Sequence, residues 1–378
     1  MKSCGALQRA GIVLRQLIVT VLLVLLNASP LPASQAGPEA VIRIQRLSED
    51  HFLASWSFSQ PVTGVRFYPP RLGFRERSWQ VLSEGFELKT NSVGTDHAGD
   101  EISRHGEPFT GFSIEFTADS DFDPKSYVPV MPFSSGGAAV YSGFFSGDVL
   151  VDQDWQSLPT SFELIGLPGE TTLLPPQASE SSPVYVYFGE QKPLEAEQVE
   201  MIIDPQMPRW LRETFENSVP VATSVFSQRL QVSLAEKPLV LISAGELADY
   251  EGYSVKGGGL DGQFTIMLRG RDLLNHSSEQ QHMFEKMVAH ELLHVWQQAM
   301  PGGAFNPGQP WLHEGRADAL AVAALREAGV WSENQVEAFS TLQRDTCKQS
   351  LGASTLAEAA DAGNWTAIYA CGYLEFTE

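Results

Sequence analysis

The chain has 378 residues, 43% of them apolar, and its mean hydropathy is -0.12. This composition supplies enough apolar side chains for hydrophobic cores and excludes global disorder, and the length fits two domains. The 25 Lys and Arg residues against 46 Asp and Glu residues give a formal charge of -21. Such an acidic surface repels phosphate backbones, so we expect no nucleic-acid partner.

The first 36 residues predict a secretory signal peptide. Three basic residues precede an apolar run at 17–26, and a stretch of small residues ends near Ala36. The run is too short to span a bilayer, which takes about 20 residues. We expect cleavage near Ala36, a periplasmic or extracellular location and no stable membrane span afterwards. An uncleaved signal that anchors the chain to the membrane is the alternative.

Residues 37–190 predict a β-rich, sandwich-like domain. Apolar residues alternate with polar or small ones at 52–58 and 112–116, and 184–188 shares the period of two. Gly, Pro, Asp and Ser clusters separate these short runs, which is typical of a sandwich or an open barrel. A segment with Pro and Ser at 174–183 indicates the region where this domain ends.

Residues 195–378 predict a second, mainly helical domain, so the fold class is α+β. We expect helices at 208–230, 278–300 and 311–328, with Pro220 interrupting the first and Ser278 capping the second. Two buried strands are predicted between the first two helices, at 237–243 and 262–268.

The predicted helix at 278–300 contains the sequence His-Glu-Leu-Leu-His. His290 and His294 are four residues apart and share one helix face, so both imidazoles can bind one Zn²⁺. Glu291 is rotated by about 100° from His290, so its carboxylate can lie beside the metal and take a proton from bound water. The alternative is a plain amphipathic helix with two surface histidines.

A third metal ligand is predicted at the start of the next helix. Glu314 follows a connection rich in turn residues, so two antiparallel helices can bring it opposite the two histidines. Two His and one Glu leave one position for water, which is the pattern of catalytic zinc. Asp318 is placed to accept the second ring N–H of a ligand histidine. We therefore predict one Zn²⁺ per chain, and we interpret His313 as a bystander.

With these residues the chain resembles a gluzincin metallopeptidase. The 19 residues between His294 and Glu314 and the Glu-x-x-x-Asp pair match the thermolysin pattern. The sequence Trp-Leu-x-Glu-Gly at 311–315 resembles the aminopeptidase N family, which spaces its glutamate one residue closer. The resemblance covers roughly 195–378 and implies a thermolysin-like catalytic domain with a peptide or protein substrate. The glycyl aminopeptidase family is a close second.

A tyrosine near the end of the chain extends this resemblance. The sequence Ile-Tyr-Ala-Cys-Gly at 368–372 is similar to the family's Tyr-x-Lys-Gly motif. The similarity implies that Tyr369 donates a hydrogen bond to the tetrahedral oxyanion. The family's lysine is Cys371 here. A core tyrosine on a helix is the alternative reading of Tyr369.

A glycine-rich segment upstream of the metal motif resembles the family's Gly-x-Met-Glu-Asn strand. Gly259 and Asp261 lie in the sequence Gly-Gly-Leu-Asp-Gly at 258–262. The resemblance implies that both contact the substrate and that Asp261 holds its free α-amine. A Gly-rich turn before a strand is the alternative.

Two cysteines remain once the predicted signal is removed. Cys347 and Cys371 are an even number in a chain that we expect in an oxidising compartment, so they predict a disulfide. Two buried thiols are the alternative.

Together these patterns predict a secreted zinc peptidase, most similar to an aminopeptidase. A thermolysin-type endopeptidase, a hydrolase of non-peptide amides and a binding protein on a vestigial peptidase scaffold are the alternatives. The chain ends nine residues after Tyr369, so we expect either a small variant or a truncated product. The sequence leaves the oligomeric state open.

Overall fold

The computed structural model describes residues 37–68, 73–90, 99–121, 126–176, 178, 182–300, 306 and 308–377. The predicted signal peptide lies outside these described residues. Within them, no helix has both the length and the apolar character that crossing a membrane requires. Pro38–Glu378 form one compact unit, and the predicted domain boundary near residue 190 stays a prediction.

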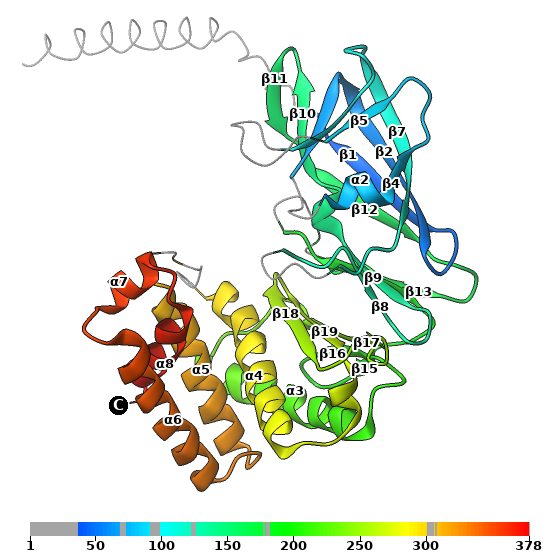
Figure 1. Ribbon diagram of the computed structural model, residues 1–378. Helices are drawn as coiled ribbons and strands as arrows, with labels where there is room; N and C mark the ends of the chain where they lie inside the picture. The colour runs from blue at the N-terminus through cyan, green and yellow to red at the C-terminus, as the bar shows by residue number, and fades with distance from the viewer. Residues whose placement is uncertain are drawn as a thin grey trace, which may run out of the picture. The chain divides into compact units, whose positions relative to one another are not determined.

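The first half is β-rich, as predicted, and holds three sheets (Figure 1). The first sheet has the order β12-β1-β2-β7-β4, the second β11-β10-β3-β6-β5 and the third β13-β14-β9-β8. The strands of the first sheet are β1 (Ala40–Arg46), β2 (His51–Val62), β4 (Trp79–Val81), β7 (Phe109–Thr117) and β12 (Thr160–Ile165). Those of the second are β3 (Gly64–Phe67), β5 (Glu87–Lys89), β6 (Asp100–Ser103), β10 (Gly147–Val151) and β11 (Asp154–Ser157). Those of the third are β8 (Val130–Pro132), β9 (Ala138–Tyr141), β13 (Thr171–Leu173) and β14 (Tyr185–Gly189).

The predicted alternation places one face of β2 and β7 in an aromatic core. Trp56 stacks on Phe112 with ring centroids 4.5 Å apart, and Phe52 stacks on Phe116 at 4.9 Å. All four are cross-strand partners in the register of the two strands. Aromatic pairs across neighbouring strands stabilise a sheet beyond the area that they bury.

A fourth sheet opens the second half of the chain, with the order β15-β16-β17-β19-β18. Its strands are β15 (Leu194–Glu195), β16 (Glu200–Ile203), β17 (Leu239–Glu246), β18 (Ser254–Leu260) and β19 (Gln263–Arg269). The two strands predicted here are β17 and β19. The glycine-rich segment is mostly strand, since β18 runs through it antiparallel to β19 at the sheet edge.

Both faces of this fourth sheet are covered, which explains its almost continuous apolar strands. Leu239 and Leu241 of β17 pack with the apolar core of the β-rich half. Val240 and Ile242, on the opposite face, pack with the apolar side chains of the helices. The sheet therefore joins the β-rich half to the helices that carry the predicted metal ligands.

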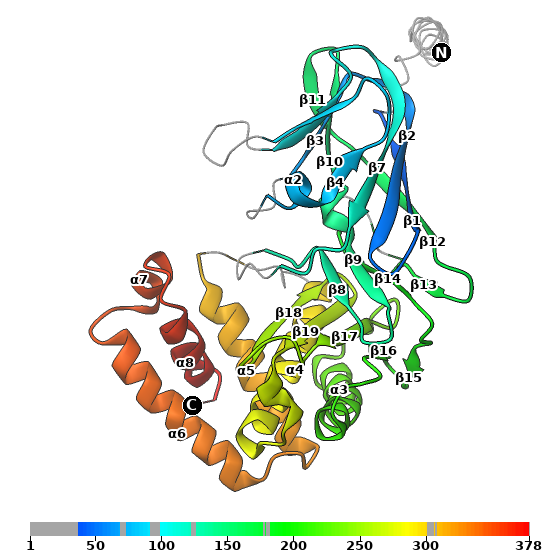
Figure 2. The ribbon, with the colours of Figure 1, turned by 45° about the vertical axis from the view of Figure 1, so that its right-hand side comes forward.

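The second half of the chain contains the three predicted helices and three more that were not predicted (Figure 2). They are α3 (Arg209–Leu230), α4 (Ser278–Ala299), α5 (Pro310–Glu327), α6 (Glu333–Leu351), α7 (Leu356–Asp361) and α8 (Trp365–Glu375). Pro220 lies inside α3 without ending it. The predicted N-cap of α4 is wrong by one residue, because the side chain of Ser277, rather than Ser278, accepts the hydrogen bond from the backbone N–H of Gln280.

Helices α5 and α8 cross with their backbones in contact at Gly315 and Gly372. A Cβ atom built on Gly315 would lie 2.2 Å from the carbonyl carbon of Gly372, a distance that no pair of carbon atoms tolerates without covalent bonding. Glycine inside a helix costs about 1 kcal/mol relative to alanine. At this position glycine is nevertheless required, because any side chain would prevent the close approach of the two helices.

The predicted disulfide is present between α6 and α8. It joins Cys347 to Cys371, 24 residues apart in sequence. Ala359 and Ala367 pack beside it in a small apolar cluster that is separate from the larger cores. Helix α8 is therefore held by α5 through backbone contact and by α6 through a covalent bond.

Gly315→Ala is expected to lower the free energy of unfolding by about 1–3 kcal/mol, because the added methyl group forces α5 and α8 apart. This loss exceeds the gain in helix propensity. Chemical denaturation measures it. Gly258→Ala is the matched control, since a Cβ there meets nothing within 4 Å. Equal unfolding free energies for the two variants would contradict the close crossing.

Candidate metal centre

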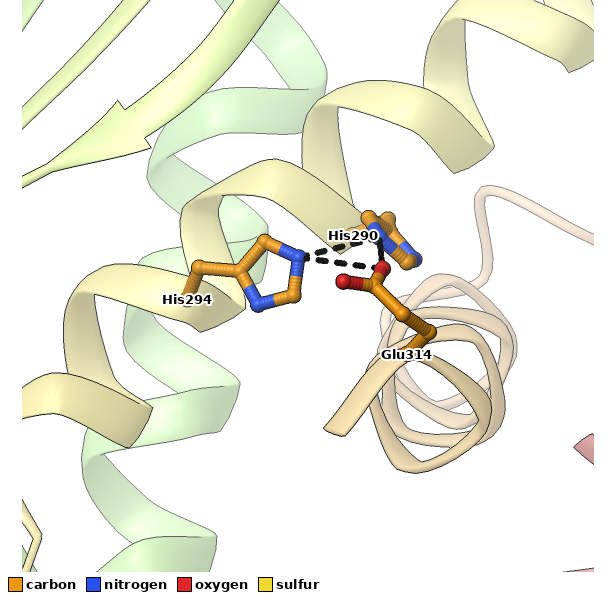
Figure 3. A group of neighbouring side chains, drawn as sticks. All are labelled: His290, His294 and Glu314. Atoms are coloured by element: carbon orange, nitrogen blue, oxygen red, sulfur yellow. Dashed lines mark hydrogen bonds and ion pairs between the residues drawn. The ribbon is translucent and has the colours of Figure 1, made fainter. Parts of the chain in front are cut away.

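Three side chains from α4 and α5 converge on one point (Figure 3). The Nε2 atoms of His290 and His294 are 3.1 Å apart. The Oε2 atom of Glu314 is 3.1 Å from the first of these nitrogens and 3.5 Å from the second. Their three ligand atoms lie within 4.8 Å of one another, so a single metal ion can be reached by all three.

The apolar face of α4 buries this cluster. Leu292 and Leu293, within the motif, are fully buried against the helical core. The same packing leaves His290 only 4% and His294 only 8% exposed. Polar groups with so little access to water need partners inside the protein.

The hydrogen bonds that the Nδ1 atoms make determine the tautomer of each histidine. His290 Nδ1 lies 2.6 Å from Asp318 Oδ1, and His294 Nδ1 lies 2.7 Å from Gln297 Oε1. The amide of Gln297 is oriented because its nitrogen donates to the carbonyl of His313 at 3.1 Å. Both Nδ1 atoms are therefore donors, which leaves both Nε2 atoms as acceptors in the neutral rings. In this state three lone pairs point at one position, which a proton or a metal ion can occupy.

Asp318, which accepts the hydrogen bond from His290, also forms an ion pair. Lys286, one turn before His290 on α4, places its Nζ atom 2.6 Å from Asp318 Oδ1. Burial alone raises the pKa of Asp318, but the hydrogen bond from His290 and the charge of Lys286 hold it below its usual range. Asp318 is thus an anion that orients His290, as carboxylates behind metal-binding histidines do.

The charges of the cluster favour a cation at its centre. Burial lowers the pKa of His290, but hydrogen bonds with Asp318 and Glu314 outweigh it and raise the pKa to about 9. Burial raises the pKa of Glu314, yet its hydrogen bonds with His290 and His294 hold it far below the usual range. Without a metal ion, a proton therefore occupies the position that a cation would take.

Tyr369 and Glu291 border the same point. The ring of Tyr369, on α8, lies 5.7 Å from the ring of His290. Burial and then the charge of Glu314, together with a hydrogen bond to that carboxylate, raise the pKa of Tyr369 well above 10, so its hydroxyl remains a donor. Glu291 is half-buried on α4, and its charge adds to the same rise in pKa.

The two predicted substrate contacts differ in their surroundings. Gly259, on the edge strand β18, lies against α4, since a Cβ there would be 3.0 Å from His294 Cβ and 3.3 Å from the carbonyl oxygen of Glu291. Asp261 is exposed in the following turn, where it accepts a hydrogen bond of 2.9 Å from Ser182 Oγ. The structure therefore brings Gly259 to the metal-binding helix, whereas the hydrogen bond of Asp261 is to a residue outside the cluster.

Sequence reasoning missed two residues that support His294. Gln297 lies three residues after it, a helical spacing that was available as a signal. His313 is not among the three converging side chains, in keeping with its interpretation as a bystander to the metal, but its ring stacks on that of His294 at 4.4 Å with an angle of 4°. Burial, followed by the charge of His294, lowers the pKa of His313 to about 4 and keeps it neutral. This stacking follows from the packing of α4 on α5, which spacing alone does not reveal.

Comparison with protein families gives a match over the central part of the chain. Residues 213–344 match the family model BSP, described as a peptidase of plants and bacteria. This segment contains α4 and α5, and with them all three converging side chains. A search of curated proteins found no match.

Comparison with solved structures extends the likeness over most of the chain. An aminopeptidase N family protein from Idiomarina loihiensis is 12% identical, with a TM-score of 0.57, over 89% of this chain and 65% of that one. Yeast LTA4 hydrolase is 10% identical, with a TM-score of 0.45, over 89% of this chain and 57% of that one. An M1 zinc metallopeptidase from Deinococcus radiodurans is 14% identical, with a TM-score of 0.41, over 89% of this chain and 80% of that one.

These similarities concern the fold alone. The assignment of the fold rests on the Idiomarina protein, whose TM-score is 0.57. The chain spans 65% of the length of the Idiomarina protein. The predicted α+β class, with a β-rich N-terminal part and a helical C-terminal part, is confirmed. The chain has the fold of this aminopeptidase N family protein, and its residues 213–344 match the model of a peptidase family.

Proposed function

We propose that the chain is a zinc-dependent peptidase. The observation that carries this proposal is the convergence of two buried imidazole nitrogens and one carboxylate oxygen, which all lie within 4.8 Å of one another. Two imidazoles and one carboxylate are the donor set of catalytic zinc sites. His290, His294 and Glu314 would therefore hold one Zn²⁺. When bound, the ion supplies a Lewis acid that polarises a peptide carbonyl and acidifies water.

The residues around the ligands have the chemistry that peptide hydrolysis needs. Glu291 is the proposed general base, which accepts a proton from the attacking water and passes it to the leaving amine. Tyr369 is the proposed donor to the oxyanion that develops on the substrate. Asp318 and Gln297 keep the two imidazoles in the tautomer that binds a metal.

An aminopeptidase is the first candidate for the mode of cleavage, with Asp261 as the ligand of the free α-amine. An endopeptidase of the thermolysin type is the second candidate. One observation favours the second, because Asp261 is exposed and already accepts a hydrogen bond from Ser182. Export through the predicted signal peptide is part of the proposal for either mode.

Glu291→Gln is expected to lower the rate of peptide hydrolysis by about 10²–10⁴-fold, because the amide cannot accept a proton. Zinc content, measured by atomic absorption, is expected to stay at one ion per chain. Glu279→Gln removes one charge from the exposed first turn of the same helix and is the matched control. Hydrolysis by Glu291→Gln at the rate of the unmodified chain would contradict the role of Glu291 as the general base.

Gln297→Leu is expected to weaken zinc binding by about 10–100-fold, because His294 loses the acceptor that orients its ring. Competition with a chromophoric chelator measures the affinity. Gln298→Leu, the next residue on the helix and exposed, is the control. Similar affinities in the two variants would remove Gln297 from the support of the metal site.

Tyr369→Phe is expected to lower kcat by about 10²–10³-fold while zinc content and KM change little, because the hydroxyl acts only on the developing oxyanion. Tyr250→Phe, at an exposed position, is the control. A loss of stability with an unchanged kcat would favour the interpretation of Tyr369 as a core residue.

The mode of cleavage is tested by digesting a peptide mixture with the zinc-loaded chain and analysing the products by mass spectrometry. Free and N-terminally blocked peptides are compared, with Glu291→Gln as the inactive control. Stepwise loss of N-terminal residues from free peptides alone would establish an aminopeptidase, and internal cuts an endopeptidase. If no peptide is cleaved, the binding-protein alternative replaces the proposal.

A further inference from the structure

Trp365 is an exposed aromatic side chain beside the candidate metal centre. It is the first residue of α8, and 50% of its surface is exposed. Single exposed aromatic residues are common on protein surfaces, so exposure alone indicates no function. The position of this one is informative, because Trp365 lies one helical turn before Tyr369 and on the same face of α8.

A line of aromatic rings leads from Trp365 to the predicted metal ligands. The centroid of its indole ring lies 6.4 Å from that of Tyr369, and the Tyr369 ring lies 5.7 Å from the imidazole of His290. Both spacings fall within the roughly 4.5–7 Å over which aromatic pairs interact. Tyr369 is itself only partly buried, so the exposed indole and the phenol next to the metal ligands belong to one accessible strip of α8.

The backbone that carries Trp365 is held in place from both sides. Asn364, the N-cap of α8, accepts a hydrogen bond of 3.2 Å from the backbone N–H of Ala367. Its side-chain nitrogen donates one of 2.9 Å to the carbonyl of Ser350 in the last turn of α6. The disulfide joins the same two helices. An aromatic ring on a fixed backbone has little conformational freedom to lose on binding, so more of the contact energy contributes to affinity.

A peptide bound for hydrolysis would pass within reach of this ring. In the proposed reaction Tyr369 donates to the oxyanion on the scissile carbonyl, so the two residues that share the cleaved bond lie beside its phenol. One helical turn, about 5.4 Å along the axis, separates Trp365 from Tyr369. The side chain of a phenylalanine or tyrosine in either substrate position is long enough to cover this distance, whereas that of an alanine is not.

We propose that Trp365 binds an aromatic side chain of the substrate, from one of the two residues that share the cleaved bond. This assignment rests on the proposed peptidase function and adds the class of substrate to it. Contact with the indole would bury apolar surface of both rings, and aromatic pairs gain free energy beyond that of the buried area. A small side chain would obtain neither contribution.

The test compares the hydrolysis of short Ala-Gly peptides with free amino termini by the zinc-loaded chain. One peptide lacks phenylalanine, and each of the others carries one phenylalanine at a different position. Mass spectrometry identifies the cleaved bond and gives kcat/KM. The highest value is expected where phenylalanine adjoins the cleaved bond, about tenfold above that of the peptide without phenylalanine.

Trp365→Ala is expected to lower this ratio by about tenfold, whereas Trp365→Phe keeps an aromatic ring and is expected to retain most of it. Phe376→Ala is the matched control, because Phe376 is a 43% exposed aromatic residue directly after the other end of α8. An undiminished ratio in Trp365→Ala, or equal hydrolysis of all peptides by the unmodified chain, would overturn the proposal. Trp365→Gln repeats the test if the alanine variant does not fold.

A binding measurement separates this proposal from the peptidase function. In zinc-loaded Glu291→Gln, isothermal titration calorimetry with the phenylalanine peptides is expected to give dissociation constants that the added change Trp365→Ala raises by about tenfold. Equal dissociation constants would overturn the assignment of Trp365. If this difference is found but no peptide is hydrolysed, the peptidase function fails and the aromatic site stands. If peptides are hydrolysed without a preference for phenylalanine, the aromatic site fails and the peptidase function stands.

Discussion

The backbone contact between Gly315 and Gly372 is the constraint on which the arrangement of the site depends. Glu314 precedes the first glycine by one residue, and Tyr369 precedes the second by three. Because α5 and α8 touch at this point, the carboxylate and the phenol that they carry are brought close enough for the charge of Glu314 to raise the pKa of Tyr369. The site is thus built on helices whose separation is set by the absence of two side chains, and such rigid elements position functional groups better than loops do.

Electrostatic balance explains why so many polar groups are buried together. Glu314 and Asp318 are anionic, and Lys286 offsets one of the two charges through its ion pair with Asp318. One negative charge and two imidazole lone pairs remain directed at a common point. An isolated buried charge is costly, so the cluster is stable only with a proton or a metal ion in place. A divalent cation would satisfy all three donors at once.

The parts of this protein that followed from its sequence are those governed by local rules. The period of two in β2 predicted a strand, and the four-residue spacing of His290 and His294 predicted a shared helix face, because both depend only on backbone geometry. The stacking of His313 on His294 depends on how α4 packs on α5, which leaves no periodic pattern in the sequence. The shift of the α4 cap by one residue has a simpler cause, since Ser277 and Ser278 are chemically identical.

The disulfide gives α8 a dependence on its chemical surroundings. Cys371 lies two residues after Tyr369, and the bond closes a loop that spans 24 residues. A cross-link over such a span lowers the entropy of the unfolded chain by an amount equivalent to about 3 kcal/mol. In a reducing compartment this contribution is lost, and α8 is then retained by non-covalent contacts such as the cluster around Ala359 and the packing of Tyr373 on Phe339. A reducing compartment therefore lowers the stability of the helix that carries Tyr369.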